Sequence, residues 1–314
     1  MKIVDMHADS IVEMYKTHQH LNSNNLHIDK MKMLKGDYLL QNMAIFLDSR
    51  SYKNITKLAK KIIKFYNKEV KFNNINRVYK YSDIKRDSLN TMLTIEDSAI
   101  VPFCELEEFY KLGVRMITLT WNYINEVGYP NLDGDNLESL EDLKRIDNIN
   151  GLKPSGLEYI KKMEDLNIIV DISHGSNKLV EDVLNNSNKP FVASHSNSYS
   201  VTQVGRNLND NLIRKMIERD CVIGMNFCSE FICDKTNHES SIEDLIKHID
   251  YILNLGGENS IGFGGDLDGI NSILEIKDSS NMQLIIEALE KRYSKNIVKK
   301  ISYENVLSLY EKVL

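Results

Sequence analysis

Acidic and imidazole side chains recur at the ends of the apolar runs in this sequence. The first run, KIVDMHAD at residues 2–9, places Asp5, His7 and Asp9 at every second position. Side chains two residues apart on a β-strand point to the same face, so these three share a face with Ile3. Polar groups on the inner face of a sheet are costly to bury unless something satisfies them. A solvated edge strand and a metal-binding strand both explain this run when it is taken alone.

Apolar, β-rich runs alternate with segments of helical spacing along the chain. Helical segments are expected at 55–66, 155–166, 210–219 and 241–255, where apolar residues lie three and four apart. Strands alternating with helices predict parallel strands with crossover helices, and eight strands in this length predict an α/β fold of the (β/α)8 TIM-barrel type. An open doubly wound sheet is the alternative, but no G-x-G-x-x-G motif follows the first run. The predicted strands are 2–8, 40–47, 91–95, 114–120, 167–173, 191–195, 221–227 and 260–265.

The residues that could do chemistry stand where the predicted strands end. The carboxyl ends of barrel strands meet on one rim, where barrel enzymes build their active sites, and the long loops expected at 17–30 and 123–153 belong to that rim. Imidazole and carboxylate together suit zinc best, with cobalt, manganese or iron as alternatives. The set is large enough for two ions, which would generate a hydroxide nucleophile at neutral pH. Its members are His7, Asp9, Glu96, His174, His195 and Asp266.

Composition narrows the class of protein. The chain is 42% hydrophobic and 27% charged, as expected of one globular domain spanning residues 1–314. The net charge of −6 and the lack of a basic stripe argue against nucleic-acid binding. No apolar run approaches the length of a membrane span, and the first predicted strand begins too early to leave room for a signal peptide. The four cysteines form no CxxC pair, so we expect a cytoplasmic protein with reduced thiols.

An ordered set of motifs resembles the membrane (renal) dipeptidase family, which are binuclear zinc peptidases among the amidohydrolase-like barrels. The motifs cover nearly the whole chain, and their order is more specific than any one of them. They are DMHAD (5–9), TIEDS (94–98), GVRMITLTWN (113–122), VDISHGS (170–176), ASHSNS (193–198), GRNLND (205–210) and GFGGDLDGI (262–270). The resemblance implies that His7 and Asp9 hold one zinc, that His174 and His195 hold the other, and that Glu96 bridges the two.

The resemblance also implies roles around the two metals. Asp266 would take a proton from the bridging water and deliver it to the leaving amine. Arg206 would bind the free carboxylate of the substrate in a planar bidentate pair that lysine could not reproduce. Trp121 stands where the best-known members have a histidine that steadies the oxyanion; an indole N–H donates one hydrogen bond but does not titrate. A second departure is Asp97, which follows Glu96 where glycine is usual.

Three functional hypotheses follow from these residues. The leading one is a zinc-dependent dipeptidase acting on small dipeptides with free termini, with the acceptance of a C-terminal D-residue left open; relatives are often homodimers. The second keeps the metals but deacylates N-acyl amino acids, and Arg206 would serve there too. The third is a binding protein on an inactive barrel, which predicts a lost ligand, and none of the expected ligands is missing. Only a substrate panel separates the first two hypotheses.

The remaining polar residues have simpler expected roles. Asp268 is expected to be a loop residue or a support for the site. Asn226, at the end of the seventh strand, either contacts substrate or satisfies backbone groups. The five other histidines are expected at the surface: His18, His20, His27, His238 and His248.

Overall fold

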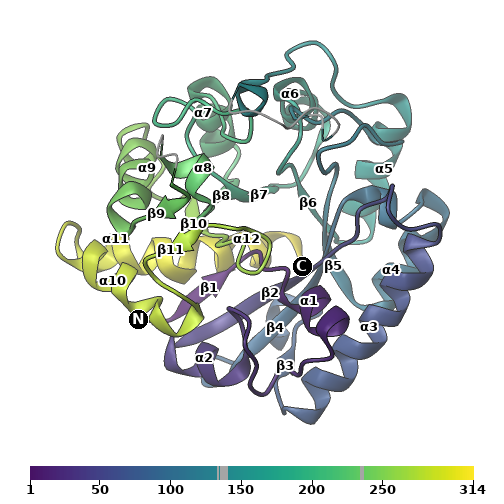
Figure 1. The fold of residues 1–314 in the computed structure, drawn as a ribbon. Coiled ribbons are helices and arrows are strands. Elements are labelled where there is room, and N and C mark those ends of the chain that lie inside the picture. Colours follow the sequence, from purple (N-terminus) through teal and green to yellow (C-terminus); the bar gives the residue numbers. More distant parts are fainter. Residues whose placement is uncertain (133, 135–140, 234–236) are drawn as a thin grey trace.

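Parallel strands form a closed ring at the centre of the molecule (Figure 1). The structure is a computed structural model that describes residues 1–132, 134, 141–233 and 237–314. The ring closes because β1 pairs with β2 and β10, and β2 also pairs with β4. Within the described residues this confirms the predicted (β/α)8 TIM barrel, and each predicted strand run overlaps one strand of the ring. In ring order the strands are β1 (Ile3–Asp5), β2 (Tyr38–Phe46), β4 (Asn90–Glu96), β5 (Val114–Thr118), β6 (Ile169–Asp171), β7 (Val192–Ser196), β8 (Val222–Met225) and β10 (Ile261–Phe263).

Helices cover the outside of the ring (Figure 1). Each of the four predicted helical segments corresponds to one of them: α3 (Ile55–Phe72), α5 (Pro154–Asp165), α7 (Asp210–Glu218) and α9 (Ile242–Asn254). No helix in the described part of the chain is long and apolar enough to cross a membrane. The other helices are α1 (Ser10–Thr17), α2 (Lys30–Lys35), α4 (Leu106–Leu112), α6 (Asn177–Asn186), α8 (Ser229–Ile232), α10 (Gln283–Glu290), α11 (Lys295–Lys299) and α12 (Asn305–Val313).

Local sequence signals set the ends of α9. The side chain of Ser241 accepts a hydrogen bond from the backbone N–H of Asp244, which satisfies one of the free donors in the first turn. The helix stops ahead of Gly256, whose φ of +95° lies in the left-handed region that glycine adopts without strain. Ser241 and Gly256 therefore set the two ends of α9, the helix that connects to strand β10.

The long connections lie where the sequence predicted them. Residues 18–29 link α1 to α2 without regular structure. The described part of the 123–153 connection contains one short 3₁₀ turn at Asp142–Lys144. Residues 133 and 135–140 of that predicted loop lie outside the described residues. Short strands decorate the barrel: β3 (Asn76–Arg77) pairs with β4, and β9 (Glu239–Ser240) pairs with β11 (Ile273–Leu274).

Helix α12 closes the barrel at the end opposite the predicted site. It crosses the ring of strands in Figure 1, and its buried face packs on apolar side chains near the amino ends of the strands. Tyr310 is fully buried there, and its hydroxyl accepts a hydrogen bond from Asn42 Nδ2 at 2.7 Å. The carboxyl ends are thereby left as the open end of the barrel. The cluster includes Val4, Met6, Leu40, Met92, Met116, Val306, Leu309 and Tyr310.

Truncating a side chain between the barrel and its helices should cost much of the stability. Phe263 in β10 is fully buried, so Phe263→Ala should lower the free energy of unfolding by about 3–5 kcal/mol through lost burial and a residual cavity. Phe72→Ala is the control, because Phe72 is 82% exposed and should change it by less than about 1 kcal/mol. Urea unfolding of both variants measures the difference. Equal losses in the two variants would contradict this account of the core.

Candidate metal centre

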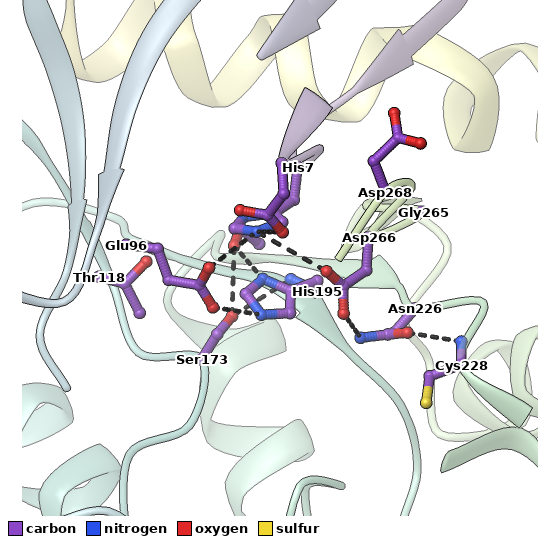
Figure 2. A network of polar contacts seen from close by, with 12 residues as sticks. His7, Glu96, Thr118, Ser173, His195, Asn226, Cys228, Gly265, Asp266 and Asp268 are labelled. Atoms are coloured by element: carbon purple, nitrogen blue, oxygen red, sulfur yellow. Dashed lines mark hydrogen bonds and ion pairs between the residues drawn. The ribbon is translucent and has the colours of Figure 1, made fainter. Parts of the chain in front are cut away.

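The structure brings the residues predicted from the strand ends together at the open end of the barrel (Figure 2). All of them are buried, and they form three overlapping groups whose ligand atoms lie within 4.8 Å of one another. Imidazole nitrogens with carboxylate oxygens form a donor set suited to zinc and related divalent ions. The groups are His7, Asp9 and Glu96; Glu96, His174 and His195; and His7, His195 and Asp266.

Glu96, the last residue of β4, divides its two carboxylate oxygens between two of these groups. Its Oε2 lies 3.4 Å from His7 Nε2, whereas its Oε1 lies 2.8 Å from His174 Nε2 and 3.5 Å from His195 Nε2. Burial alone would raise the pKa of Glu96, but the charge on His7 holds that pKa well below its ordinary value. An ionised carboxylate with one oxygen facing each group has the arrangement that a bridging ligand needs.

Hydrogen bonds set the tautomers of His174, which follows β6, and of His195, which lies near the end of β7. The Nδ1–H of His174 donates to Asn122 Oδ1 at 2.7 Å, and the Nδ1–H of His195 donates to Ser194 Oγ at 2.8 Å. The Ser194 hydroxyl donates its hydrogen to Asp171 Oδ2 at 2.6 Å, so it cannot also donate to His195. Burial lowers the pKa of His174 to about 4 and that of His195 well below its ordinary value. Both rings are therefore neutral and present an unprotonated Nε2.

The convergent atoms favour a positive charge between them. The two unprotonated Nε2 atoms of His174 and His195 face each other at 3.0 Å, where their lone pairs repel. His7 Nε2 and Asp9 Oδ1 are buried without a hydrogen-bond partner. Although burial opposes it, the carboxylates of Glu96 and Asp9 raise the pKa of His7 well above its ordinary value. These described residues fit divalent metal ions both by donor type and by charge.

Asp266 lies at the edge of the cluster and is oriented from behind. Its Oδ1 is 3.9 Å from His7 Nε2, and its Oδ2 accepts a hydrogen bond from Asn226 Nδ2 at 3.0 Å. The amide of Asn226 is itself fixed, because its Oδ1 accepts from the backbone N–H of Cys228 at 2.7 Å (Figure 2). Asn226 is fully buried and joins a backbone group to the carboxylate. The sequence marked this asparagine as a strand-end residue but could not show that its neighbour is Asp266.

Asp5 lies outside the three groups and has a different role. Strand β1 ends at Asp5, so the strand alternation does not continue to His7 and Asp9. The backbone of Asp9, with φ −88° and ψ 3°, is not extended and leads into α1. The Asp5 carboxylate accepts hydrogen bonds from the backbone N–H groups of His7 at 2.9 Å and Gly265 at 3.1 Å. It therefore fixes the two chain segments that carry His7 and Asp266, and of the three polar residues in the first run, His7 and Asp9 belong to the metal-binding groups.

Strained backbone conformations occur at the site. His174, Asp266 and Asp97 have φ values of +68°, +58° and +85°, in a region that side chains other than glycine rarely adopt. The φ of Asp97 is one that glycine would adopt without strain. Here the Asp97 side chain compensates by accepting hydrogen bonds from Ala99 N at 2.9 Å and Asn125 Nδ2 at 2.8 Å.

A cavity of about 500 Å³ opens over the cluster, and Arg206 and Trp121 both line it. Arg206 is 4% exposed and forms no ion pair with any carboxylate in the described part of the chain. Its Nη2 donates to the His195 carbonyl at 3.3 Å, and its Nε is buried without a partner. Trp121 packs against Phe46, with ring centroids 4.6 Å apart. The cavity thus combines an unpaired buried guanidinium with an aromatic wall.

Two further sequence expectations have different outcomes. Asp268 points away from the cluster (Figure 2) and accepts a hydrogen bond from the His27 backbone N–H at 2.8 Å, as expected of a supporting residue. His248 was expected at the surface, but that prediction is wrong because the side chain is fully buried. Its Nδ1 accepts from Ser198 N at 3.1 Å and its Nε2 donates to the Ile232 carbonyl at 3.2 Å. His248 therefore ties the loop after β7 to α8.

Comparison with known families agrees with this geometry. The family model described as "Membrane dipeptidase (Peptidase family M19)" matches residues 1–313. The chain belongs to the membrane dipeptidase family. Its members are metallo-dipeptidases of amidohydrolase-like fold, which confirms the resemblance inferred from the ordered motifs.

Individual members of the family and solved structures resemble this chain to different degrees. An uncharacterized dipeptidase of Schizosaccharomyces pombe is 33% identical over 165 residues, which is 52% of this chain and 38% of that protein. The crystal structure of dipeptidase AC, an M19 metallopeptidase, covers 100% of this chain and 98% of its own, with 20% identity and a TM-score of 0.86. A Rhodobacter sphaeroides metallopeptidase liganded with a phosphinate mimic of L-Ala-D-Ala covers 100% and 99%, with 19% identity and a TM-score of 0.84. The two structures establish the barrel fold.

The buried carboxylates should make the metal-free protein less stable as the pH rises. Burial, reinforced by the negative charges of Asp9 and Glu96, raises the pKa of Asp266 to about 8 in the folded state, against about 3.9 when unfolded. The stabilisation from protonated Asp266 is therefore complete below the unfolded pKa and is lost as the pH rises through the folded pKa. In chelator, the melting temperature should fall by several degrees between about pH 5 and about pH 8, and Asp266→Asn should reduce that fall.

Asp87→Asn is the matched control, because Asp87 is exposed and its substitution should leave the pH dependence unchanged. Thermal melts across the pH range measure both variants. A fall of the same size in Asp266→Asn and in the unmodified protein would show that Asp266 does not carry the effect.

Proposed function

We propose that this protein is a zinc-dependent dipeptidase that hydrolyses the peptide bond of small dipeptides with free termini, including dipeptides with a C-terminal D-residue. The arrangement of Glu96 and Arg206 supports the proposal most directly. The Glu96 carboxylate divides its oxygens between two groups of imidazole and carboxylate ligands. The buried guanidinium of Arg206 lies in the same cavity and has no carboxylate partner among the described residues. The first feature fits a pair of metal ions, and the second fits a substrate with a free carboxylate.

The proposed centre takes two zinc ions. His7 and Asp9 would hold one ion, His174 and His195 would hold the other, and Glu96 would contact both. Bound zinc supplies Lewis-acid chemistry, because it polarises a carbonyl and makes a nearby water more acidic. His174 and His195 are fixed in the Nδ1–H tautomer, which leaves Nε2 free, as such binding requires.

The cavity residues would orient the dipeptide and move the proton. Arg206 would bind the C-terminal carboxylate through two parallel N–H donors, and its burial strengthens that pairing. Asp266 would accept the proton of the attacking water at Oδ1 and then give it to the leaving amine, while Asn226 Nδ2 holds the other oxygen in place. Trp121 would lie against the substrate and offer one indole N–H. Unlike the usual histidine, it cannot exchange a proton.

Acceptance of a C-terminal D-residue rests on the liganded relative. The Rhodobacter sphaeroides metallopeptidase was solved with a mimic of L-Ala-D-Ala, and it has the same fold as this chain. A clamp on the carboxylate does not by itself distinguish the two configurations at the adjacent carbon. Deacylation of N-acyl amino acids is the alternative activity, because those substrates present the same carboxylate to Arg206.

A substrate panel tests the proposal. Release of free amino acids is measured from L-Ala-L-Ala, L-Ala-D-Ala and N-acetyl-L-Ala, with added zinc and with a chelator. We expect zinc-dependent, chelator-sensitive cleavage of the two dipeptides only. Glu96→Ala should abolish turnover by removing the shared ligand and leave the far-UV circular dichroism unchanged. Cleavage of the acetylated compound alone would establish a deacylase instead, and unchanged turnover in Glu96→Ala would overturn the metal-based proposal.

Arg206→Lys should weaken the use of the substrate carboxylate. A lysine ammonium cannot form the bidentate pair, and the loss of a charge-assisted hydrogen bond of about 1.5–3 kcal/mol corresponds to a decrease in kcat/KM of about ten- to a hundredfold. The loss should lie mainly in KM for L-Ala-L-Ala and be absent for L-Ala-L-Ala amide, which lacks the carboxylate. Arg292→Lys, at an exposed ion pair with Glu243, is the control. Equal losses on the acid and the amide would refute the clamp.

A further inference from the structure

One wall of the cavity carries a carboxylate that lies outside the metal-binding groups. Glu230, in α8, lines the cavity together with Arg206 and Phe231. Its Oε2 accepts hydrogen bonds from Cys228 Sγ at 3.0 Å and Ser229 Oγ at 2.7 Å. These contacts come from the same short turn, so they hold the Glu230 carboxylate in a defined place on the cavity wall.

Glu230 is ionised and only weakly compensated. Burial alone would raise the pKa of Glu230, but hydrogen bonds from Cys228, Ser229 and His238 outweigh it and lower that pKa to about 2. Its ion-pair partner among the described residues is His238, whose Nδ1 lies 2.5 Å from Oε1 and whose side chain is 62% exposed. An ion pair this exposed is weakened by solvent, so His238 compensates the Glu230 carboxylate only in part.

Glu13, another carboxylate of the cavity lining, differs in this respect. It also lines the cavity, but it pairs with Lys16, with Nζ and Oε1 2.9 Å apart on the same helix. The wall formed by α8 thus adds a weakly compensated carboxylate to the cavity, and Glu13 provides a matched comparison at the same cavity.

The loop that carries Arg206 and the helix α8 that carries Glu230 are neighbours and are joined by direct contacts. Arg206 lies in the loop after β7, and Glu230 follows β8, the next strand of the ring. The Phe231 ring lies 5.3 Å from the Arg206 guanidinium, and Asn207 Nδ2 donates to the Phe231 carbonyl at 2.8 Å. A substrate residue whose carboxylate binds Arg206 can therefore extend its side chain along Phe231 towards Glu230.

We propose that Glu230 selects dipeptides whose C-terminal residue carries a cationic side chain, lysine or arginine. This inference rests on the proposed function, since it uses Arg206 as the site of the C-terminal carboxylate. The methylene groups of such a side chain pack on Phe231, while its cation pairs with Glu230. The wall is partly buried, so the pair is screened less by water than a surface ion pair would be.

The test compares side chains of similar length with and without charge. The ratio of kcat/KM for L-Ala-L-Lys to that for L-Ala-L-norleucine should be about ten in the unmodified protein, the factor that corresponds to one favourable ion pair. Glu230→Gln should bring this ratio close to one, and Glu13→Gln should leave it near ten. The reversed pair, L-Lys-L-Ala and L-norleucyl-L-Ala, should show no such dependence on Glu230.

A ratio near one in the unmodified protein, a ratio kept in Glu230→Gln, or a dependence on Glu230 only in the reversed pair would each overturn the inference. Calorimetric binding of L-Ala-L-Lys and L-Ala-L-norleucine to Asp266→Asn, with and without Glu230→Gln, separates it from the proposed function. Charge-selective binding without cleavage by the unmodified protein would support the role of Glu230 and refute the dipeptidase activity. Cleavage without charge selection would do the reverse.

Discussion

Negative charge concentrated at one end of the barrel is the constraint on which the rest of the site depends. Asp9, Glu96 and Asp266 are all buried within the three overlapping groups of ligand atoms, and burying ionised carboxylates is costly unless positive charge compensates them. Burial accordingly raises the pKa of Asp9 to about 6 and that of Asp266 to about 8. His7 compensates in part, because the carboxylates raise its pKa. The other two histidines are held neutral by burial. The protein alone thus leaves a deficit of positive charge at the point where the ligand atoms converge, which is the electrostatic condition for binding divalent cations.

The strands meet this constraint by placing a polar layer beneath the site. Asp5 and Asp171 are fully buried, and each accepts hydrogen bonds from backbone N–H groups of segments that carry ligands. Asp171 Oδ2 also accepts hydrogen bonds from Thr118 Oγ1 and Ser194 Oγ, both at 2.6 Å. Below this layer the interior becomes apolar and α12 closes it. The ligands are therefore positioned by the rigid interior of the barrel, and that rigidity can sustain the left-handed φ of His174.

The sequence predicted the parts that depend on periodicity and order along the chain. Strand runs followed by His, Asp or Glu located the cluster, because parallel strands bring their carboxyl ends to one rim. It could not predict contacts across the barrel, such as Asn226 with Asp266, since these depend on strand register. Asp5 was grouped with His7 because the strand alternation was continued to residue 9, whereas β1 ends at Asp5. His248 lies on the buried face that Leu245 and Ile252 define, and it was misplaced because the sequence does not show the backbone partners that allow a histidine to be buried there.

The cavity wall restricts which side chain can carry a proton during hydrolysis. Neither the indole of Trp121 nor the amide of Asn226 titrates, so neither can exchange a proton with substrate. Burial raises the pKa of Cys228 well above its ordinary value, which keeps its thiol protonated, and Arg206 remains a cation. Asp266, whose carboxylate faces the cluster, is the group that we propose accepts and returns the proton. In the proposed mechanism, tryptophan at position 121 would therefore change how the oxyanion is stabilised and would leave the proton path through Asp266 intact.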